Sequence, residues 1–271
     1  MTDPQQIKQL RHTVWTHYKK YARDDLPWRL THDPYKILVS ETMLQQTQVS
    51  RVIEKYTAFL KQFPTVRSLA AAPLRDVLAA WQGLGYNRRA KMLHTAAQAI
   101  VSNHKGRVPH EYVVLKTLPG IGPYTAGAVC AFAYDIPIPI VETNIRTVLF
   151  HHLLGTRTEV PDSELLILSG LLLDKKKPRE WYYAMMDYGA FLKTKQVRLN
   201  TKSKHYTKQS KFEGSDRQVR GAILRILTIE NTVRENTIIE KAKAAPARVH
   251  AQLAALQKEG LVRRQRGRWM I

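Results

Sequence analysis

The stretch that decides the fold is Leu118-Pro119-Gly120-Ile121-Gly122-Pro123-Tyr124-Thr125-Ala126-Gly127. A short apolar segment leads into it, and a helix is predicted to begin at Pro123, because proline is favoured at a first helical position. Gly120 and Gly122 allow the tight, left-handed or close-approach backbone that such a turn needs. The sequence therefore predicts a hairpin between two helices, whose outward N–H groups can hold a phosphate. On these residues alone, an ordinary turn fits equally well.

A phenol and a carboxylate flank the loop that follows the hairpin. Tyr124 is the second residue of the predicted helix, and Glu142 opens the next helix after the loop 135–139. Two reactive side chains are thus expected on two helix starts beside a phosphate-holding turn. This combination favours a functional site over a plain turn.

Charge indicates the class of partner. The chain has 271 residues, long enough for one or two domains with a sizeable core. Its formal net charge is +21, and such an excess favours a polyanion, most simply a nucleic acid. The alternative, a generally basic protein of the ribosome-associated kind, also places nucleic acid nearby.

Cysteine usage and hydropathy exclude several classes. Cys130 is the only cysteine, so an intramolecular disulfide and a metal site built from several thiolates are both excluded. The first residues carry no signal-peptide core, and no stretch is apolar enough to span a bilayer. The expected location is the cytoplasm, in association with the nucleoid.

Helical periodicity covers the first two-thirds of the chain. Apolar residues recur at helical spacing and are separated by short polar, proline or glycine segments. Helices are predicted over 5–22, 35–47, 49–63, 67–71, 74–81, 88–103, 111–118, 123–134, 143–154, 162–175 and 179–192. Short loops between amphipathic helices indicate an all-α domain.

The remaining residues read as a basic linker and a small second domain. Between 193 and 211 there are seven Lys or Arg residues and no acid, which predicts a linker over 193–214. Residues 215–271 predict three helices and then a hairpin with a basic tip, the pattern of a winged helix-turn-helix. Its expected DNA-contacting residues lie on the third helix and the wing: Arg248, Arg264, Arg266 and Arg268. A winged helix that binds a protein instead is the alternative.

Four more motifs accompany the hairpin. They are Leu26-Pro27-Trp28-Arg29, Ser40-Glu41-Thr42-Met43-Leu44-Gln45-Gln46-Thr47-Gln48-Val49, Trp81-Gln82-Gly83-Leu84-Gly85-Tyr86 and Ala184-Met185-Met186-Asp187-Tyr188-Gly189-Ala190. As a set, over about residues 5–192, they resemble the helix-hairpin-helix (HhH-GPD) DNA glycosylases. The Leu-Gln-Gln-Thr-Gln and Gly-Leu-Gly-Tyr strings resemble the MutY adenine glycosylase branch.

The resemblance implies an all-α fold and an activity. It implies a two-lobed glycosylase domain over 1–192, ahead of the linker and the winged helix. It further implies a monofunctional DNA glycosylase of base excision repair, a monomer that flips a mispaired base out of double-stranded DNA and hydrolyses its N-glycosidic bond. The implied target is adenine opposite 8-oxoguanine or guanine. The alternatives are another damaged or mismatched base, and a non-catalytic protein that binds DNA or senses its structure.

Two carboxylates suit the implied chemistry, because one can protonate the leaving base while the other stabilises a cationic sugar. Glu41, among apolar residues, matches the general acid, and Glu142, at a helix N-terminus, is expected to stay ionised. The family has an aspartate at the position of Glu142. Tyr124 replaces the lysine of strand-cleaving relatives, and Asn144 is placed with the catalytic group. Alternatively, Glu41 is a paired core acid and Glu142 only decorates a first turn.

The resemblance also assigns contacts to DNA and to the flipped base. Gln46 and Tyr86 match the wedge that fills the vacated space in the duplex. The expected DNA contacts are Gln46, Leu44, Gln45, Tyr86, Gly85, Arg88, Gly120, Gly122 and Thr125. The expected base pocket consists of Trp28, Arg29, Leu26 and Asp187, although Trp28 suits a core position equally well.

Cofactor expectations follow from the same resemblance. The family usually carries an iron–sulfur cluster after the Gly-Ala motif, but Lys193 stands where the first cluster cysteine falls. No cluster and no other metal are therefore expected, apart from a monovalent cation on the hairpin carbonyl groups. The winged helix also stands where the MutY branch carries a larger β-rich module that reads the base opposite the target.

Overall fold

The computed structural model describes residues 3–195, 199, 202–204 and 211–271. Most of the basic segment 196–210 in the predicted linker therefore lies outside the described residues. The chain divides into two compact units. Unit 1 combines Met1–Glu41, Pro109–Thr117 and Ile121–Lys208, and unit 2 combines Thr42–Val108, Leu118–Gly120 and Gln209–Ile271.

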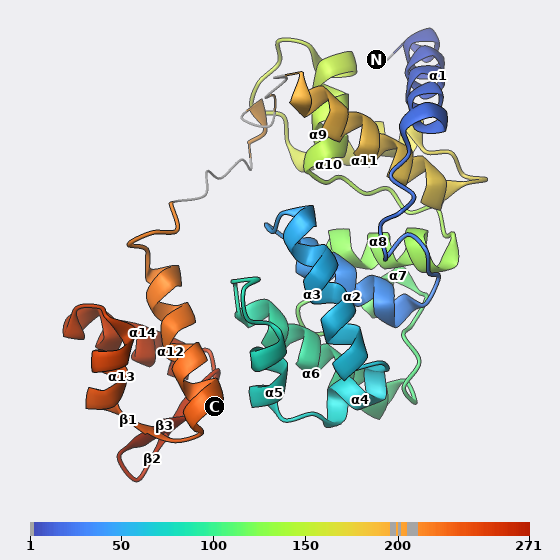
Figure 1. The fold of residues 1–271 in the computed structure, drawn as a ribbon. Helices are drawn as coiled ribbons and strands as arrows, with labels where there is room; N and C mark the ends of the chain where they lie inside the picture. The colour runs from blue at the N-terminus through green and yellow to red at the C-terminus, as the bar shows by residue number, and fades with distance from the viewer. Residues whose placement is uncertain (1–2, 196–198, 200–201, 205–210) are drawn as a thin grey trace. The chain divides into compact units, whose positions relative to one another are not determined.

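Unit 1 is a cluster of helices around α11, shown in Figure 1. Helix α11 packs against α1, α8 and α9, and α10 packs against α9. Its large apolar side chains, such as Trp181 and Phe150, are fully buried. The elements are α1 (Pro4–Tyr21), most of α2 (Pro34–Leu44), α7 (Tyr112–Leu115), α8 (Pro123–Tyr134), α9 (Thr143–Leu149), the π-helical turn η1 (Phe150–Leu154), α10 (Asp162–Leu172) and α11 (Pro178–Thr194).

Unit 2 joins four central helices to the C-terminal elements. Helix α6 packs against α4 and α5, and α12 packs against α5, α13 and α14. The elements are α3 (Val49–Gln62), α4 (Val66–Ala71), α5 (Leu74–Ala80), α6 (Arg88–Asn103), α12 (Asp216–Glu230), β1 (Val233–Arg234), α13 (Glu235–Ala242), α14 (Pro246–Lys258), β2 (Arg263–Gln265) and β3 (Arg268–Met270).

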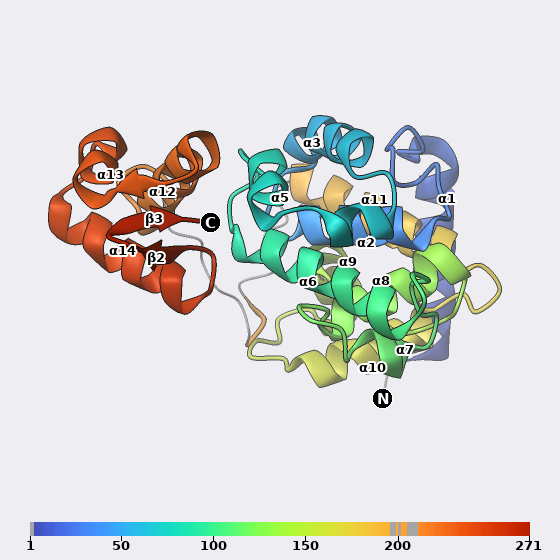
Figure 2. The same cartoon turned by 90° about the horizontal axis from the view of Figure 1, so that it is seen from below.

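The C-terminal elements follow the order of a winged helix, as Figure 2 shows. The sheet is antiparallel in the order β1-β3-β2, so the strand β3 is central. Strand β1, which has two residues, was not predicted, because so short a segment has no readable alternation. Trp269 on β3 is buried and donates from Nε1 to Glu235 Oε2 at 2.9 Å, which ties the sheet to the start of α13.

Two cationic side chains attach the C-terminal helices to the central helices of unit 2. Arg75 on α5 donates from Nε to the carbonyl of Thr228 at the end of α12, at 2.8 Å. Lys91 on α6 donates to the carbonyl of Glu259, which follows α14, at 2.5 Å. These bonds satisfy carbonyl groups that helix ends leave without an intrahelical partner. They hold α12 and α14 beside α5 and α6.

Every predicted helix is present, and four of them end three or more residues before the predicted position. One is α10, which ends at Leu172 instead of residue 175. The helix α2 ends at Leu44 instead of residue 47, because Gln46 has a φ of 54°, outside the helical region. The segment predicted as 111–118 contains only the four-residue α7. The helix predicted to end at 154 becomes a π-turn after Leu149. Among the described residues, no helix is long and apolar enough to cross a membrane.

Candidate active site

Glu41 lies in unit 1 on α2, in a run of buried residues that includes Ile37, Leu38 and Met43. Its side chain is only 5% exposed. Burial raises the pKa of Glu41 to about 7, because the carboxylate loses its hydration. That pKa is the net of three effects, since burial and the charge of Glu142 raise it and a hydrogen bond from Tyr124 lowers it. Near neutral pH the group is therefore divided between its acid and its anion, as a general acid requires.

Tyr124 is the direct partner of Glu41. Helix α8 begins after the N-cap Gly122 with Pro123 at its first position, which puts the phenol one residue into the helix. The phenol donates to Glu41 Oε2 at 2.9 Å. Burial and the two nearby glutamates raise the pKa of Tyr124 well above its ordinary value. The phenol therefore keeps its proton and acts as a hydrogen-bond donor to Glu41.

Glu142 is the N-cap of α9. Its Oε1 accepts hydrogen bonds from the backbone N–H groups of Asn144 at 2.7 Å and Ile145 at 2.8 Å. Its Oε2 accepts from the Asn144 side-chain amide at 3.1 Å. The residue does cap the helix, as the structural alternative requires. Because its charge also acts on Glu41, the cap lies within electrostatic reach of the acid.

The expectation that the helix start keeps Glu142 ionised requires a correction. Burial raises the pKa of Glu142 above its ordinary value, because desolvation disfavours the anion. The two backbone hydrogen bonds and the charges of Lys193 and Arg146 oppose the rise. The anion therefore depends on these neighbours as well as on the helix terminus.

Lys193, near the end of α11, belongs to the site although the sequence analysis placed it in a linker. Its Nζ donates to Asn144 Oδ1 at 2.7 Å, and burial lowers the pKa of its amine while the charge of Glu142 raises it. Asn144 thus joins Lys193 to Glu142. A signal was present in the sequence, since a cation stands at the expected cysteine position.

Gly189 has no side chain, which allows α11 to pack close to Asn144. A Cβ on Gly189 would lie 2.3 Å from the backbone oxygen of Asn144, far closer than two such atoms can approach. The glycine of the Asp187-Tyr188-Gly189 motif therefore lets α11 pack directly on the first turn of α9. This close approach brings Lys193, one turn further along α11, to Asn144.

The residues expected to form a base pocket are packed together in the interior of unit 1. Asp187 is 3% exposed and accepts from Arg29 at 2.7 and 2.8 Å and from Arg23 Nε at 2.6 Å. Although burial opposes it, the arginines hold the pKa of Asp187 below its ordinary value. Trp28 and Leu26 are buried as well. The carboxylate and the guanidinium therefore balance each other's charge in the interior, and the assignment of these residues to a base pocket stays a prediction.

The wedge residues lie in unit 2 and share an unusual backbone. Gln46 has a φ of 54° and Tyr86 a φ of 47°, values that are uncommon for residues with side chains and rarest for bulky ones. Gln46 and Gly85 are exposed, while Leu44, Gln45 and Tyr86 are partly exposed. Strained backbone of this kind persists where surrounding contacts enforce it, and it concentrates at functional sites.

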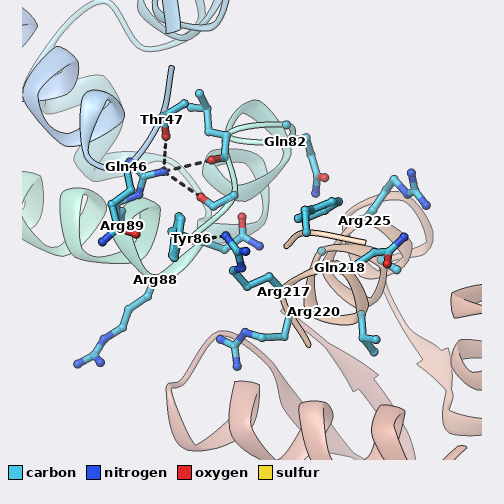
Figure 3. A pocket seen from close by; sticks show the side chains of 18 of the residues that line it. Gln46, Thr47, Gln82, Tyr86, Arg88, Arg89, Arg217, Gln218, Arg220 and Arg225 are labelled. Carbon is cyan, nitrogen blue, oxygen red and sulfur yellow. Dashed lines mark hydrogen bonds between the residues drawn. The ribbon is translucent and has the colours of Figure 1, made fainter. Parts of the chain in front are cut away.

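Arg89 supplies those contacts, although the sequence analysis selected its exposed neighbour Arg88 instead. The guanidinium of Arg89 connects the segment around Gln46 to the turn before Tyr86. It donates to the carbonyl oxygens of Thr42, Met43, Gln45, Leu84 and Gly85 and to Thr47 Oγ1, at 2.5 to 3.2 Å. One side chain thus fixes both wedge loops, and Figure 3 shows it beside Thr47 and Gln46. Residue type alone did not distinguish Arg89 from Arg88.

The hairpin glycines play two different roles. Gly120 has a φ of +74°, and a Cβ there would lie 2.4 Å from Met92 Cβ, so both conformation and packing require glycine. At Gly122 a Cβ would meet nothing within 4 Å, which leaves its backbone open to a phosphate. Thr125, expected to contact DNA, is 3% exposed. It is buried together with the residues that follow it in α8, and this corrects the expectation that it contacts DNA.

The arginines expected on the recognition helix and wing differ in their partners. Arg248 on α14 pairs with Asp216 at 2.7 Å, so its charge is already balanced. Arg264 lies 3.8 Å from Glu235. Arg266 and Arg268 are exposed at the tip of the hairpin. The structure therefore leaves the wing tip available, and a DNA contact by Arg248 stays a prediction.

The residues do not fit an iron–sulfur cluster. The chain has one cysteine, and Cys130 is buried in α8 with its Sγ 3.4 Å from the carbonyl oxygen of His110. Among the described residues, no group of three or more His, Cys, Asp or Glu side chains is arranged to hold a metal. The monovalent cation on the hairpin stays a prediction.

Comparisons with known proteins agree with this arrangement. Residues 39–167 match the model of the HhH-GPD superfamily of base excision DNA repair proteins. A protein of Mycolicibacterium smegmatis named adenine DNA glycosylase is 36% identical over 261 residues, which cover 89% of each chain. A human protein of the same name is 34% identical over 206 residues, covering 72% of this chain and 38% of the human one.

Solved structures show the same fold. A thermostable thymine-DNA glycosylase is 27% identical with a TM-score of 0.61, and the match covers 69% of this chain and 87% of that one. A trapped covalent intermediate of endonuclease III with DNA is 20% identical with a TM-score of 0.63, covering 70% and 88%. At that identity the second likeness concerns the fold alone.

Proposed function

We infer the activity from one premise: the chain belongs to the HhH-GPD superfamily of base excision DNA repair proteins. It is a DNA N-glycosylase, and it excises adenine, the base in the names of relatives that align over most of its length. We propose further that the adenine lies opposite 8-oxoguanine or guanine, that the strand is left intact, and that the enzyme acts as a monomer.

The observation that carries the proposal is the protonatable pair formed by Glu41 and Tyr124. Departure of adenine requires a proton on the base, and a group with a pKa of about 7 can give one up at neutral pH. The phenol fixes the orientation of the carboxyl group through a 2.9 Å bond. The base must leave the duplex stack to meet Glu41, because the bond is inaccessible inside the helix.

Glu142 supports the second half of the reaction. Loss of the base leaves a sugar with cationic character, which a neighbouring carboxylate stabilises. The family has aspartate here, and the extra methylene of glutamate lengthens the side chain by about 1.5 Å. In this chain the carboxylate is turned back onto the N–H groups of Asn144 and Ile145. These bonds fix the carboxylate at the start of α9, where we propose that it faces the cationic sugar.

The side chains also support base removal without strand cleavage. Tyr124 stands where strand-cleaving relatives have a lysine, and a phenol cannot form a Schiff base with the sugar. The amine of Lys193 is engaged by Asn144 at 2.7 Å. We therefore propose that Lys193 stabilises the Glu142 anion and does not attack the sugar.

The test is a single-turnover assay on duplexes that carry each mispair, with and without alkali. Adenine release opposite 8-oxoguanine or guanine, with strand breaks only after alkali, is the expected result. Equal breakage without alkali would contradict the absence of lyase chemistry, and borohydride trapping would then identify the amine. No abasic product from any mispair would favour the non-catalytic DNA-binding alternative.

A further inference from the structure

A wide groove lies in unit 2 beside the wedge residues. It is lined by residues 45–48, by the turn and helix start 82–89, and by the first turns of α12, including Arg217, Arg220 and Arg225. Figure 3 shows Arg217 reaching Tyr86, with Arg220 and Arg225 extending from the same helix in other directions. Its volume of about 1820 Å³ exceeds the ~300–1,000 Å³ of small-molecule sites. The size suits a stretch of polymer.

The charge of the groove is strongly one-sided. Of its described lining residues, nine are Arg or Lys and one, Glu259, is an acid. Arg220 pairs with that acid at 2.6 Å. Among the described residues, Arg51, Arg88 and Arg225 take part in no ion pair. Cations gathered without counter-charges are suited to consecutive phosphates, whose condensed counterions they release on binding.

The groove is physically joined to the wedge. Arg217 on α12 donates to the Tyr86 hydroxyl at 2.9 Å, and its guanidinium lies 5.4 Å from the centre of the same ring. Arg89 approaches that ring to 5.5 Å. A nucleic acid backbone in the groove would thus run alongside the residue that enters the duplex. One DNA molecule would then contact both the groove and the wedge residue Tyr86.

The C-terminal elements therefore offer DNA a surface on α12 that the winged-helix pattern does not indicate, in addition to Arg248 on the expected recognition helix, which lines the same groove. Arg248 on the expected recognition helix is paired with Asp216, whereas Arg225 on α12 is exposed and faces the groove. We propose that the groove binds the sugar-phosphate backbone of the substrate duplex, with Arg88 on one wall and Arg225 on the other. This inference rests on the proposed function, since it takes DNA as the substrate.

The experiment measures the salt dependence of binding. Affinity for a fluorescein-labelled duplex, unmodified or carrying an adenine mispair, is followed by anisotropy between 50 and 200 mM NaCl. The groove variant is Arg88→Gln/Arg225→Gln, and the wing variant is Arg266→Gln/Arg268→Gln. The matched control is Lys175→Gln/Lys176→Gln, which removes two exposed charges of unit 1. Circular dichroism verifies that each variant is folded.

The groove variant is expected to flatten the plot of log affinity against log salt by about 2, since each phosphate contact contributes ~0.9 to the slope. The control should keep the wild-type slope. A wild-type slope in the groove variant would overturn the inference, and loss of slope only in the wing variant would assign the contact to the wing. Adenine release by the wild type is measured in parallel. Its absence would count against the proposed function, whereas the slopes decide the groove independently.

Discussion

In unit 1 the polar side chains of the candidate active site are few, buried or half-buried, and bonded to one another. In unit 2 those around Gln46 and Tyr86 include many cations and line an open groove. Burial gives Glu41 a pKa of about 7, a change that an exposed carboxylate does not undergo. The arginines of the groove act instead through their positive charge. The catalytic region therefore depends on desolvation. The wedge and groove depend on positive charge and on backbone conformations that neighbouring residues hold in place.

The largest effect is expected for Glu41→Gln, which removes the acid of the candidate active site. The amide keeps the shape of the side chain but supplies no acidic proton, and general acids contribute ~10²–10⁴-fold. We expect the single-turnover rate of adenine release to fall about 10³-fold while duplex affinity stays within about twofold.

The matched control for this variant is Glu180→Gln, an exposed position on the same unit. It should retain the wild-type rate. A rate near wild type in Glu41→Gln would remove the acid from the mechanism and leave unit 1 without its defining chemistry.

In unit 2, Arg89→Met tests whether one side chain holds the two wedge loops in place. The substitution removes six hydrogen bonds from a partly buried guanidinium and releases both wedge loops. We expect the free energy of unfolding to fall by about 3 kcal/mol, measured by urea denaturation.

Its control is Arg88→Met, one residue away and exposed, which should change the free energy of unfolding by less than about 0.5 kcal/mol. Equal losses in the two variants would mean that Arg89 is not a clamp and that the positive φ angles at Gln46 and Tyr86 are maintained in some other way.

Lys193→Met is a third test, aimed at the anionic half of the active site. Loss of the cation removes an interaction that lowers the pKa of Glu142, so that pKa rises and the group protonates at higher pH. We expect a rate about tenfold lower at neutral pH and an acidic limb of the pH–rate profile that moves to higher pH.

The neighbouring charge provides the control, since Lys195 is exposed and follows α11. Lys195→Met should leave the acidic limb in place. A lower rate in Lys193→Met with an unmoved limb would indicate a packing role and would contradict the electrostatic one.

The smallest expected effect belongs to Tyr124→Phe. The wild-type rate should decline as pH rises through about 7, because Glu41 loses its proton there. The phenol's hydrogen bond lowers the pKa of Glu41, so its removal raises that pKa and moves the basic limb to higher pH by a few tenths of a unit. A limb that stays in place, or moves down, would show that another group controls the basic side of the profile.

Local patterns predicted most of the fold, and the reasons for the exceptions are physical. Helices such as α6 and α8 were predicted to within a residue, because periodic apolar residues and Pro123 mark them. The helix α2 was predicted three residues too long, because the turn at Gln46 is enforced from outside by Arg89. A hydrogen-bonding partner more than 40 positions away leaves no mark on local periodicity.

The candidate site also contains residues that local motifs predicted and residues whose contacts they did not predict. Glu41, Tyr124 and Glu142 were selected from their motifs, and the structure brings them within hydrogen-bonding or electrostatic reach of one another. Lys193 was assigned to a linker, because its position in a run of like charges gave no sign of Asn144. Arg29 and Asp187 are predicted base-pocket residues, and the structure adds that each neutralises the other, a contact between positions far apart in the sequence.

The amino-acid sequence alone indicates which side chains are able to act as acids, anions, wedges and cations, because this follows from residue type. It also indicates the helices that carry them, because helices follow from short-range spacing. Only the tertiary structure decided the strength of the acid, the partner of each charge and the side of α12 that faces the groove. Those properties depend on desolvation and on contacts between residues distant in the chain, such as Glu41 with Tyr124 and Arg217 with Tyr86. Water exclusion and charge proximity exist only after the chain has folded.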